Sequence, residues 1–398
     1  MRSMHVRRAY AGEEQRATFL ELFFDLVFVF AVTQVSHVLL EDISLTGAAK
    51  TLFLLLVVWW AWIYTAWMTN WFDPDEVAVR IVLLAGMLAS LLMAIAIPEA
   101  FGDRALLFAA GYVGLQLVRN TFVVLAIHDS EPLRAPFQRL WAWNSWVGVI
   151  WIVGALLPED ARIAVWIAAL VLDYAGPLAG YWTPGLGRTP ITDWELEHSH
   201  FAERFQLFII IALGESIVLT GAAASDLELT LPRALAIVTA FLVTAVLWWL
   251  YFDQVARRSV EDFAAADDKR GLLGRDAYTY LHIPIVAGII VNAVGDELVI
   301  AHPTEKLPAD ELAVLAAGPI LYLLGHIAFR LRMTATLATR RLIATVLIAA
   351  AAAAGAALPA LAVAVIVLLI LLLLAASETT GRVRAKRTDS RASTATAS

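Results

Sequence analysis

Twelve long apolar stretches follow one another along this chain of 398 residues, and they constrain its fold more than any other feature. Each stretch has about 17–25 residues, the length that an α-helix needs to cross the hydrocarbon core of a bilayer. We place them at 19–40, 48–69, 77–97, 104–127, 139–157, 161–182, 200–222, 232–253, 277–297, 312–332, 339–356 and 358–376. The pattern predicts an all-α fold, a polytopic membrane bundle of about 12 transmembrane helices.

The composition of the chain agrees with a membrane protein. Hydrophobic residues make up 60% and charged residues only 16% of the sequence, whereas soluble domains carry about 25% charged residues. The chain therefore lacks the polar surface that would cover a water-soluble globule of this size. It has no cysteine, which excludes disulfides, thiolate metal sites and haem attached through Cys. Its 14 Trp residues suit helix ends and the interfacial belts of a membrane protein.

The distribution of Lys and Arg predicts the orientation of the chain. Twelve spans place both termini on one side of the membrane, and that side receives 22 of the positive residues against five on the other. Because positive residues gather in cytoplasmic loops, we predict a multi-pass protein of the cell (plasma) membrane with cytoplasmic N- and C-termini. Residues 1–18 form a basic cytoplasmic arm, and 377–398 form a Ser/Thr/Arg-rich tail that we expect to be disordered.

Short sequence matches relate the two halves of the chain. Four segments recur in order in the corresponding spans: 19–23 with 201–205, 71–73 with 251–253, 100–103 with 293–296, and 109–111 with 316–318. They predict two parallel six-helix repeats, 19–182 and 200–376, joined by a cytoplasmic linker at 183–199. Such repeats are typical of several transporter folds. The alternative explanation is that all membrane helices share a similar composition.

Charged residues lie inside the first and seventh spans, although a charge in hydrocarbon costs roughly 2.5–3.5 kcal/mol. Glu21 and Asp25 are four residues apart and share one helix face. Arg204 in the seventh span is a natural partner for a carboxylate of the first, which leaves the second carboxylate without a cation. We group the charged residues of this region as one predicted network: Glu21, Asp25, His37, His200, Glu203, Arg204 and Asp253.

Other ionisable residues lie deeper, and they are our candidates for binding a substrate or a coupling ion: Asp173, Glu215, Arg119, His282 and His326. Pro177 cannot donate a hydrogen bond to the carbonyl of Asp173. An acid and a freed carbonyl are therefore expected together near the middle of the membrane. The alternative for all of these charges is a structural role, as buried ion pairs that fix the register of the helices.

Several other kinds of site find little support in the sequence. His198 and His200, with three glutamates nearby, raise the possibility of a metal site, but their spacing matches no specific signature. The sequence contains no Gly-rich phosphate loop, no Ser-His-Asp arrangement and no nucleic-acid-binding module. We therefore predict no metal, no cofactor, no catalytic residue and no nucleic-acid partner.

Four segments resemble a known bacterial family. They are ELFFDLVFVFAVTQVSH (21–37), HFAERFQLFIIIALGES (200–216), LYFD (250–253) and YLHIPIVAGIIVNAVGDE (280–297). They are similar to the low temperature requirement A (LtrA) family, and the resemblance extends over about residues 17–376. The positions that match its motifs are Glu21, Asp25, His37, His200, Glu203, Arg204, Gly214, Glu215, Asp253 and His282. Gln206 departs from the Gly that the family often has there, which puts close packing at that position in doubt.

The resemblance implies a multi-pass membrane protein linked to growth at low temperature, and it implies no particular chemistry. From the repeats and the deep charges we hypothesise a secondary transporter, proton- or cation-coupled, whose partners are membrane lipid and a small-molecule or ion substrate. A membrane-embedded enzyme acting on lipid and a non-catalytic membrane component are the alternatives. A water-accessible cavity lined by Asp173, Glu215 and Arg119 would favour transport. The substrate and the oligomeric state stay open.

Overall fold

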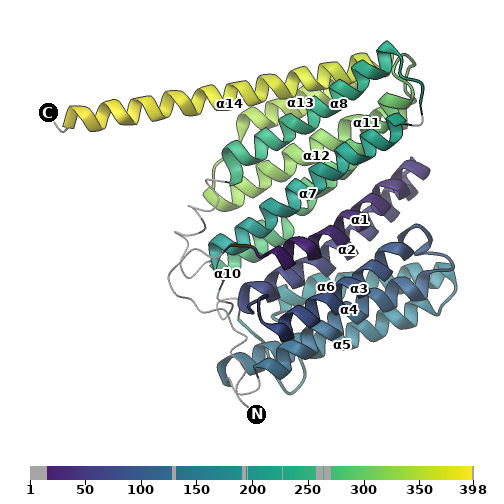
Figure 1. Cartoon of the computed structure of the whole chain (residues 1–398), viewed down its shortest axis with the longest axis vertical. Helices are drawn as coiled ribbons and strands as arrows, with labels where there is room; N and C mark the ends of the chain where they lie inside the picture. Colours follow the sequence, from purple (N-terminus) through teal and green to yellow (C-terminus); the bar gives the residue numbers. More distant parts are fainter. Residues whose placement is uncertain are drawn as a thin grey trace. The chain divides into compact units, whose positions relative to one another are not determined.

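The all-α prediction is confirmed by the computed structural model, which describes residues 16–127, 131–190, 194, 196–225, 227–256, 263 and 270–396. Across these ranges the chain forms helices, turns and one isolated antiparallel bridge between Thr183 and Gly187. Twelve of the helices are long, and each one overlaps a predicted apolar stretch (Figure 1). They are α1 (Phe19–Glu41), α2 (Leu45–Trp71), α3 (Val77–Ala96), α4 (Ala105–Ala126), α5 (Glu131–Ala155), α6 (Glu159–Ala179), α7 (His198–Ser225), α8 (Leu231–Leu250), α11 (Ile283–Ala301), α12 (Ala309–Thr334), α13 (Thr339–Gly355) and α14 (Ala360–Thr396).

Ten helical segments in the described part of the chain are long and apolar enough to cross a membrane. They include ten of the twelve long helices, with α5 and α13 outside the set. Helix α13 has 17 residues, which at 1.5 Å per residue gives about 25 Å, less than the ~30 Å of a typical hydrocarbon core. The structure thus supports a multi-pass membrane protein with ten clear candidate spans.

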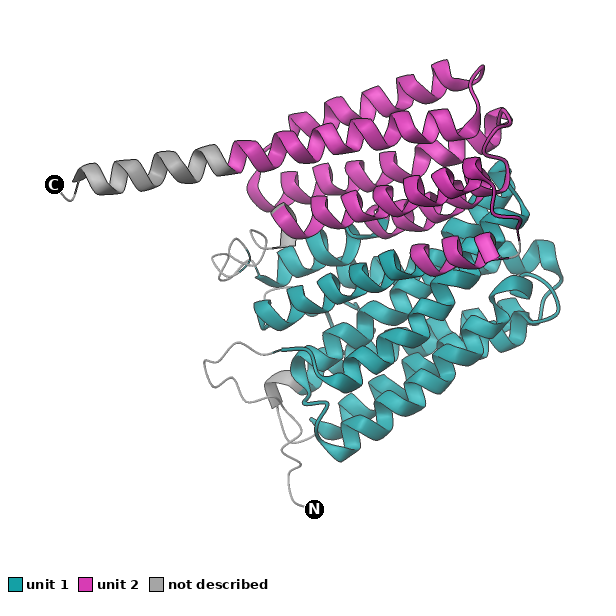
Figure 2. Cartoon of the chain, turned by 45° about the horizontal axis from the view of Figure 1, so that its top comes forward, with its two compact units in different colours: residues 1–215, 262–283 teal, residues 216–261, 284–398 magenta. Residues whose placement is uncertain are grey.

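The chain divides into two compact units (Figure 2). Unit 1 comprises Met1–Glu215 and Asp262–Ile283, and unit 2 comprises Ser216–Glu261 and Pro284–Ser398. One boundary therefore falls within α7 and another at the start of α11. The two parallel six-helix repeats stay a prediction.

Glycines allow helices to approach closely inside each unit. In unit 1, a Cβ added at Gly111 of α4 would lie 2.7 Å from the backbone nitrogen of Met93 in α3. In unit 2, a Cβ added at Gly318 of α12 would lie 2.5 Å from the backbone nitrogen of Asn292 in α11. Both values are far below ordinary carbon contacts, so these helix pairs pack backbone against backbone, as small residues permit in membrane proteins.

Two π-helical segments interrupt the regular helices. They are η3 (Tyr251–Ala256), which continues α8, and η5 (Gly274–Tyr280), which follows the short α10 (Arg270–Leu273). Such segments occur frequently at functional sites. Here η5 supplies two residues to the cavity described below.

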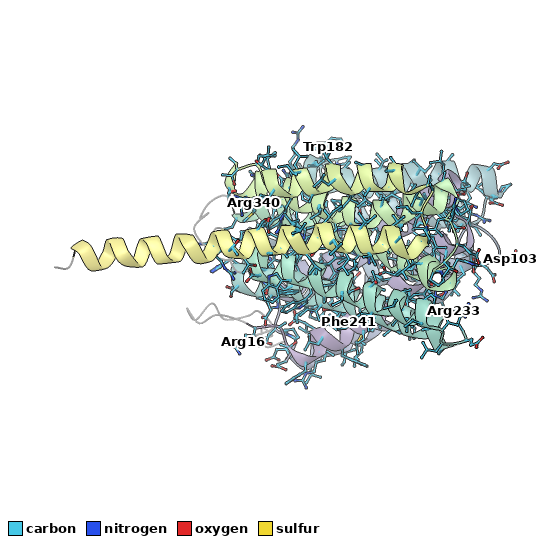
Figure 3. The ribbon with its side chains drawn as sticks, turned by 90° about the horizontal axis from the view of Figure 1, so that it is seen from above. Arg16, Asp103, Trp182, Arg233, Phe241 and Arg340 are labelled. Carbon is cyan, nitrogen blue, oxygen red and sulfur yellow. The ribbon has the colours of Figure 1, made fainter. Side chains whose placement is uncertain are left out.

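Side chains on the lateral surfaces agree with contact to lipid. Phe241 of α8 is 53% exposed and lies midway along unit 2, with Arg233 and Arg340 at its opposite ends (Figure 3). In unit 1, Arg16 and Asp103 likewise lie at opposite ends of the helices. Charged residues at helix ends and an exposed apolar residue between them are expected of membrane-spanning helices.

Helix α14 (Ala360–Thr396) extends into the segment that we predicted to be a disordered tail. Residues 377–382, which we assigned to a disordered segment, continue α14 in the structure. Glu378 forms an ion pair of 2.9 Å with Arg341 of α13, and Arg382 pairs with Asp253 of η3. These ion pairs explain the extra helical turns, because they offset the low apolar content that made the segment look disordered. Most of the predicted N-terminal arm, residues 1–15, lies outside the described residues.

Candidate functional site

One face of α2 lines a cavity inside unit 1. Trp60, Tyr64, Trp67 and Trp71 follow one another at spacings of four, three and four residues, which places them on one stripe of a helix. The cavity has a volume of about 60 Å³, which is room for roughly four ordered waters. The full lining is Trp60, Ile63, Tyr64, Trp67, Met68, Trp71, Arg119, Asn120, Val123, Phe137, Leu140, Pro177, Tyr181, Trp194, Arg275 and Thr279.

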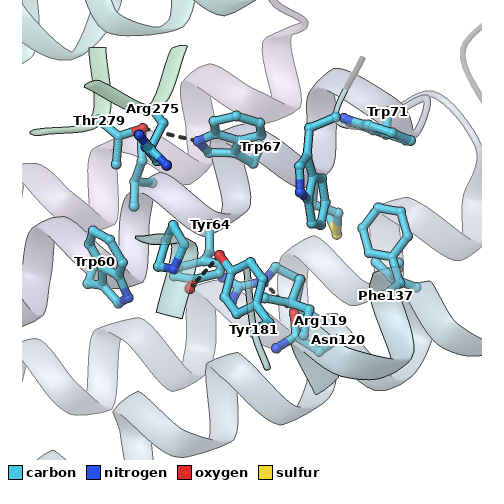
Figure 4. Close-up of a pocket in the computed structure, with 16 residues that line it drawn as sticks. Trp60, Tyr64, Trp67, Trp71, Arg119, Asn120, Phe137, Tyr181, Arg275 and Thr279 are labelled. Atoms are coloured by element: carbon cyan, nitrogen blue, oxygen red, sulfur yellow. Dashed lines mark hydrogen bonds between the residues drawn. The ribbon is translucent and has the colours of Figure 1, made fainter. Parts of the chain in front are cut away.

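Arg119 of α4 places a guanidinium at this cavity (Figure 4). It is only 2% exposed, and among the described residues it forms no ion pair. Its donors reach neutral acceptors instead: Nε donates to Asn120 Oδ1 at 3.3 Å and Nη1 to Thr65 Oγ1 at 3.2 Å. The guanidinium also lies 5.0 Å from the centroid of the Tyr64 ring. A buried cation without an anionic partner is costly, so this guanidinium attracts an anion.

Three further N–H donors of the lining lack a hydrogen-bond partner among the residues that the structure covers. They are Trp60 Nε1, Trp71 Nε1 and Asn120 Nδ2, all buried. Buried donors are normally satisfied by protein, ordered water or ligand. The cavity thus combines aromatic walls, one uncompensated positive charge and unused donors.

Two hydrogen bonds hold aromatic side chains in place around the cavity. Tyr64 Oη lies 3.0 Å from Tyr181 Oη, and Trp67 Nε1 donates to Thr279 Oγ1 at 3.2 Å (Figure 4). Burial raises the pKa of the Tyr181 hydroxyl above its ordinary value, so Tyr181 keeps its proton at neutral pH. These tyrosines therefore add polar, uncharged groups to the wall.

A line of hydrogen bonds leads from the cavity to a buried acid. Arg119 Nη2 donates to Gln116 Oε1, and Gln116 Nε2 donates to Tyr112 Oη at 3.1 Å. Tyr112 Oη then donates to Asp173 Oδ2 at 2.8 Å, and Trp151 Nε1 donates to the same oxygen at 2.9 Å. Asp173 is therefore connected to Arg119 through neutral groups without contacting it.

A cavity lined by Asp173, Glu215 and Arg119 was the observation that would favour transport. Arg119 lines the present cavity, whereas Asp173 and Glu215 are not among its lining residues. Pro177, four residues after Asp173, lines the cavity itself. Asp173 is therefore joined to the cavity only by the hydrogen bonds through Tyr112, Gln116 and Arg119.

A second polar site, which we name the buried charge cluster, consists of Glu21, Asp25, His200 and Arg204. All four residues are 0% exposed. Arg204 Nη2 lies 2.7 Å from Asp25 Oδ1, and Arg204 Nη1 lies 3.8 Å from Glu21 Oε1. His200 Nε2 lies 2.8 Å from Glu21 Oε1. In the structure Arg204 thus pairs with Asp25, an acid of the first span.

Helix α2 also contacts this cluster, through Trp62 on the face opposite the cavity and through Asn70 on the side of the helix. Trp62 Nε1 donates to Asp25 Oδ1 at 2.8 Å. Asn70 lies 3.2 Å from His200 Nδ1 and is itself held by the backbone of Glu197, which donates to Asn70 Oδ1 at 2.9 Å. One helix therefore separates the cavity from the cluster and has side chains in both.

The other predicted residues of unit 1 lie outside the buried charge cluster. Glu203 accepts a hydrogen bond of 2.7 Å from the backbone of Ala17, just before α1. His37 is exposed, and Glu215 accepts a hydrogen bond from Thr33. His282, which is also in unit 1, is buried and stacks on Tyr278, with ring centroids 5.3 Å apart.

Two predicted residues belong to unit 2. His326 of α12 is buried between Tyr322 and Tyr251, whose ring centroids lie 4.5 and 5.6 Å from its own. Asp253 pairs with Arg382, as noted above. The structure gives Asp253 a partner that the sequence-based grouping with α1 and α7 did not foresee.

The aromatic cavity was missed by the sequence analysis, which assigned tryptophans to helix ends and interfaces. Trp59, Trp60, Trp62, Trp151 and Trp166 are instead less than 2% exposed. The available signal was the spacing of aromatic residues along 60–71, a helical stripe in a span that also contains other tryptophans. No group of three or more metal-binding side chains occurs in the described part of the sequence.

Comparison with known proteins adds two findings. Residues 16–376 match the family described as bacterial low temperature requirement A protein (LtrA). A protein of Rhizobium meliloti (strain 1021), described as uncharacterized, is 38% identical over 323 residues, which cover 81% of this chain and 78% of that protein. The family match covers α1 to α13 and the first half of α14, so it includes both the cavity and the buried charge cluster.

Proposed function

The chain belongs to the bacterial LtrA family of multi-pass membrane proteins, and from that premise we propose that it is a secondary transporter of small organic anions with an aromatic or other planar group. The cavity beside α2 is the proposed substrate site. The observation that carries the proposal is Arg119, a buried guanidinium without an ion pair in the described structure, in a wall of aromatic side chains.

The chemistry of the lining supports this class of ligand. A carboxylate placed against Arg119 would remove the cost of its unpaired charge and form a charge-assisted hydrogen bond. The unused N–H donors of Trp60, Trp71 and Asn120 would serve the remaining lone pairs of the same anion. Rings of Trp60 and Tyr64 offer flat apolar surfaces to a planar group. A cationic ligand would be repelled by Arg119 and would find few acceptors.

The position of the cavity supports access from one side of the membrane. Most of its residues come from the C-terminal parts of α2, α4 and α6 and the N-terminal part of α5. Chain connectivity places these ends on one side, which the distribution of Lys and Arg predicts to be the cytoplasm. We propose Asp173, which the hydrogen-bond line joins to Arg119, as a coupling residue.

Ligand binding is the first test, and the tryptophans of the lining provide an optical signal. We would titrate the purified protein in nanodiscs with benzoate and follow tryptophan fluorescence and thermal stability. Benzamide, which keeps the ring and loses the charge, and acetate, which keeps the charge and loses the ring, are the matched ligands. We expect benzoate to bind more tightly than both, and Arg119→Gln to abolish the preference for benzoate over benzamide.

Arg104→Gln is the matched control variant, because Arg104 immediately precedes α4 and is exposed. It should bind benzoate as the unchanged protein does. Currents driven by benzoate in proteoliposomes on a solid-supported membrane would then establish transport. Equal binding of benzoate and benzamide by the unchanged protein would contradict the anion site, and binding without any current would contradict the transporter.

A further inference from the structure

The orientation of the Asn70 amide determines the protonation of His200 in the buried charge cluster. Asn70 Oδ1 accepts a hydrogen bond from the backbone N–H of Glu197, so Asn70 Nδ2 must be the atom that faces His200 Nδ1. An amide nitrogen only donates, and His200 Nδ1 must therefore accept. The imidazole keeps one proton, on Nε2, and donates it to Glu21 Oε1 at 2.8 Å. His200 is held neutral.

The cluster then contains two carboxyl groups and a single cation. Glu21 receives hydrogen bonds from His200, from the backbone N–H of Thr18 at 2.8 Å and from the Thr18 hydroxyl at 3.1 Å. It also lies in the first turn of α1, where the helix dipole favours a negative charge. These donors stabilise Glu21 as the carboxylate, and Arg204 balances its charge.

One carboxyl oxygen of Asp25 is available to bind a proton. Its Oδ1 accepts from Trp62 Nε1 and Arg204 Nη2, whereas its buried Oδ2 has no donor in the described structure. The ionisable groups near Asp25 are Glu21 on α1 and Arg204 on α7, and His200 of α7 contacts Glu21. Helix α2 presents the indole N–H of Trp62, and the buried residues of α3, which also packs on α1, include no charged one.

Arg204 can follow the charge of Asp25. Its Nε and Nη1 have no hydrogen-bond partner among the described residues, and Nη1 is 3.8 Å from Glu21 Oε1. A charge-assisted hydrogen bond needs about 2.7–2.9 Å, so a movement of about 1 Å would pair Arg204 with Glu21. With Asp25 ionised the guanidinium stays on Asp25, and with Asp25 protonated it is drawn to Glu21.

We propose that Asp25 is a proton-binding site, in which Oδ2 takes up one proton from water and Arg204 passes from Asp25 to Glu21. Uptake adds one positive charge to the cluster and makes it neutral. Trp62 and Asn70 connect the cluster to α2, and the face of α2 opposite Trp62 lines the cavity. Resting on the proposed function, the second part of this inference is that proton binding at Asp25 is coupled to anion binding in the cavity.

The proton site is tested without any ligand, by infrared difference spectra of the purified protein in nanodiscs between high and low pH. We expect the carbonyl band of a protonated carboxyl group to grow as the pH falls. Asp25→Asn should remove the part of that band that belongs to Asp25, and Glu203→Gln, which changes a neighbouring acid outside the cluster, should keep it. A band unchanged by Asp25→Asn would overturn the assignment, and so would a band absent from the unchanged protein.

A milder variant covers the case in which Asp25→Asn does not fold. Trp62→Phe removes one donor to Asp25 Oδ1 and keeps the aromatic packing, so the pH at which the band reaches half its height should rise. An unshifted band would overturn the assignment.

Coupling is measured separately, as the number of protons taken up when benzoate binds, from calorimetry in buffers of different ionisation enthalpy. We expect proton uptake in the unchanged protein and its loss in Asp25→Asn. Benzoate binding without proton uptake would overturn the coupling and leave the anion site intact. Absence of benzoate binding would overturn the coupling to this anion site, and the infrared result on the proton site would stand.

Discussion

Replacing Asp173 by Asn examines whether this buried acid carries a proton in the folded protein. Asp173 is 2% exposed and receives two hydrogen bonds, both from neutral donors and both on Oδ2. No cation contacts it within the described residues. An isolated carboxylate is far more costly to bury than a neutral carboxyl group, and the structure therefore favours the protonated form at neutral pH.

The two charge states give different losses of stability in the Asn variant. A neutral Asp173 and an Asn are alike in shape, and one oxygen of Asn can accept from both Tyr112 and Trp151. The free energy of unfolding should then fall by at most about 1 kcal/mol. Hydrogen bonds to an ionised group contribute about 1.5–3 kcal/mol against 0.5–1.5 for neutral ones. If Asp173 were ionised, loss of its charge would weaken these two hydrogen bonds by about 2–3 kcal/mol in total.

Asp173→Ala sets the scale for the measurement. It leaves the Tyr112 hydroxyl and the Trp151 indole N–H without an acceptor, at about 1–3 kcal/mol each, so we expect a total loss of about 2–6 kcal/mol. Unfolding by SDS in mixed micelles, followed by tryptophan fluorescence, would rank both variants. Asp160→Asn, on an exposed position of the same helix, is the control. An Asn variant as damaged as the Ala variant would refute the protonated state.

Three further predictions concern packing, ion pairing and orientation. Gly318→Ala should strongly lower the free energy of unfolding, because its Cβ would lie 2.5 Å from the backbone of α11. Gly214→Ala, whose Cβ would have nothing within 4 Å, should raise the free energy of unfolding by up to about 1 kcal/mol, because alanine favours helix more than glycine does. Glu378→Gln should cost about 3–5 kcal/mol in the same assay, because it leaves the buried Arg341 without a counter-ion; a change below 1 kcal/mol would contradict a buried pair. A single cysteine at Asp103, in a chain without native cysteine, should react with a membrane-impermeant maleimide in intact cells if both termini are cytoplasmic. Labelling of Asp103→Cys only after permeabilisation would reverse the orientation.

The helices could be predicted from the sequence because each one must supply enough apolar residues to cross a bilayer. Their boundaries at α1 and α3 agree with the predicted stretches to within a residue. The exceptions have local causes. Segment α13 forms a helix as expected, but the helix is short. Helix α14 continues beyond its apolar residues because Glu378 forms an ion pair with Arg341. Ion pairs between segments far apart in the sequence leave no signal in the composition of either segment.

The functional faces were harder to predict. In a soluble protein, apolar residues mark the buried face of a helix. In a membrane helix both lipid and protein interior favour apolar side chains, so the exposed Phe241 and the buried Phe205 look alike in the sequence. Spacing worked where the residues were charged, as for Glu21 and Asp25. It failed for Trp60, since tryptophan is common at interfaces as well as in cavities.

The geometry of α2 gives the proposed coupling its physical basis. Residues two apart on a helix are separated by about 200°, so Trp60 faces the cavity while Trp62 reaches Asp25 on the other side. When Asp25 takes up a proton, the hydrogen bond from Trp62 loses its charged acceptor and weakens. An anion against Arg119 contacts the opposite wall of the same helix. Both events therefore change the forces on α2. If this helix takes one position when the anion and the proton are both bound and another when both are absent, the anion and the proton are transported in the same direction.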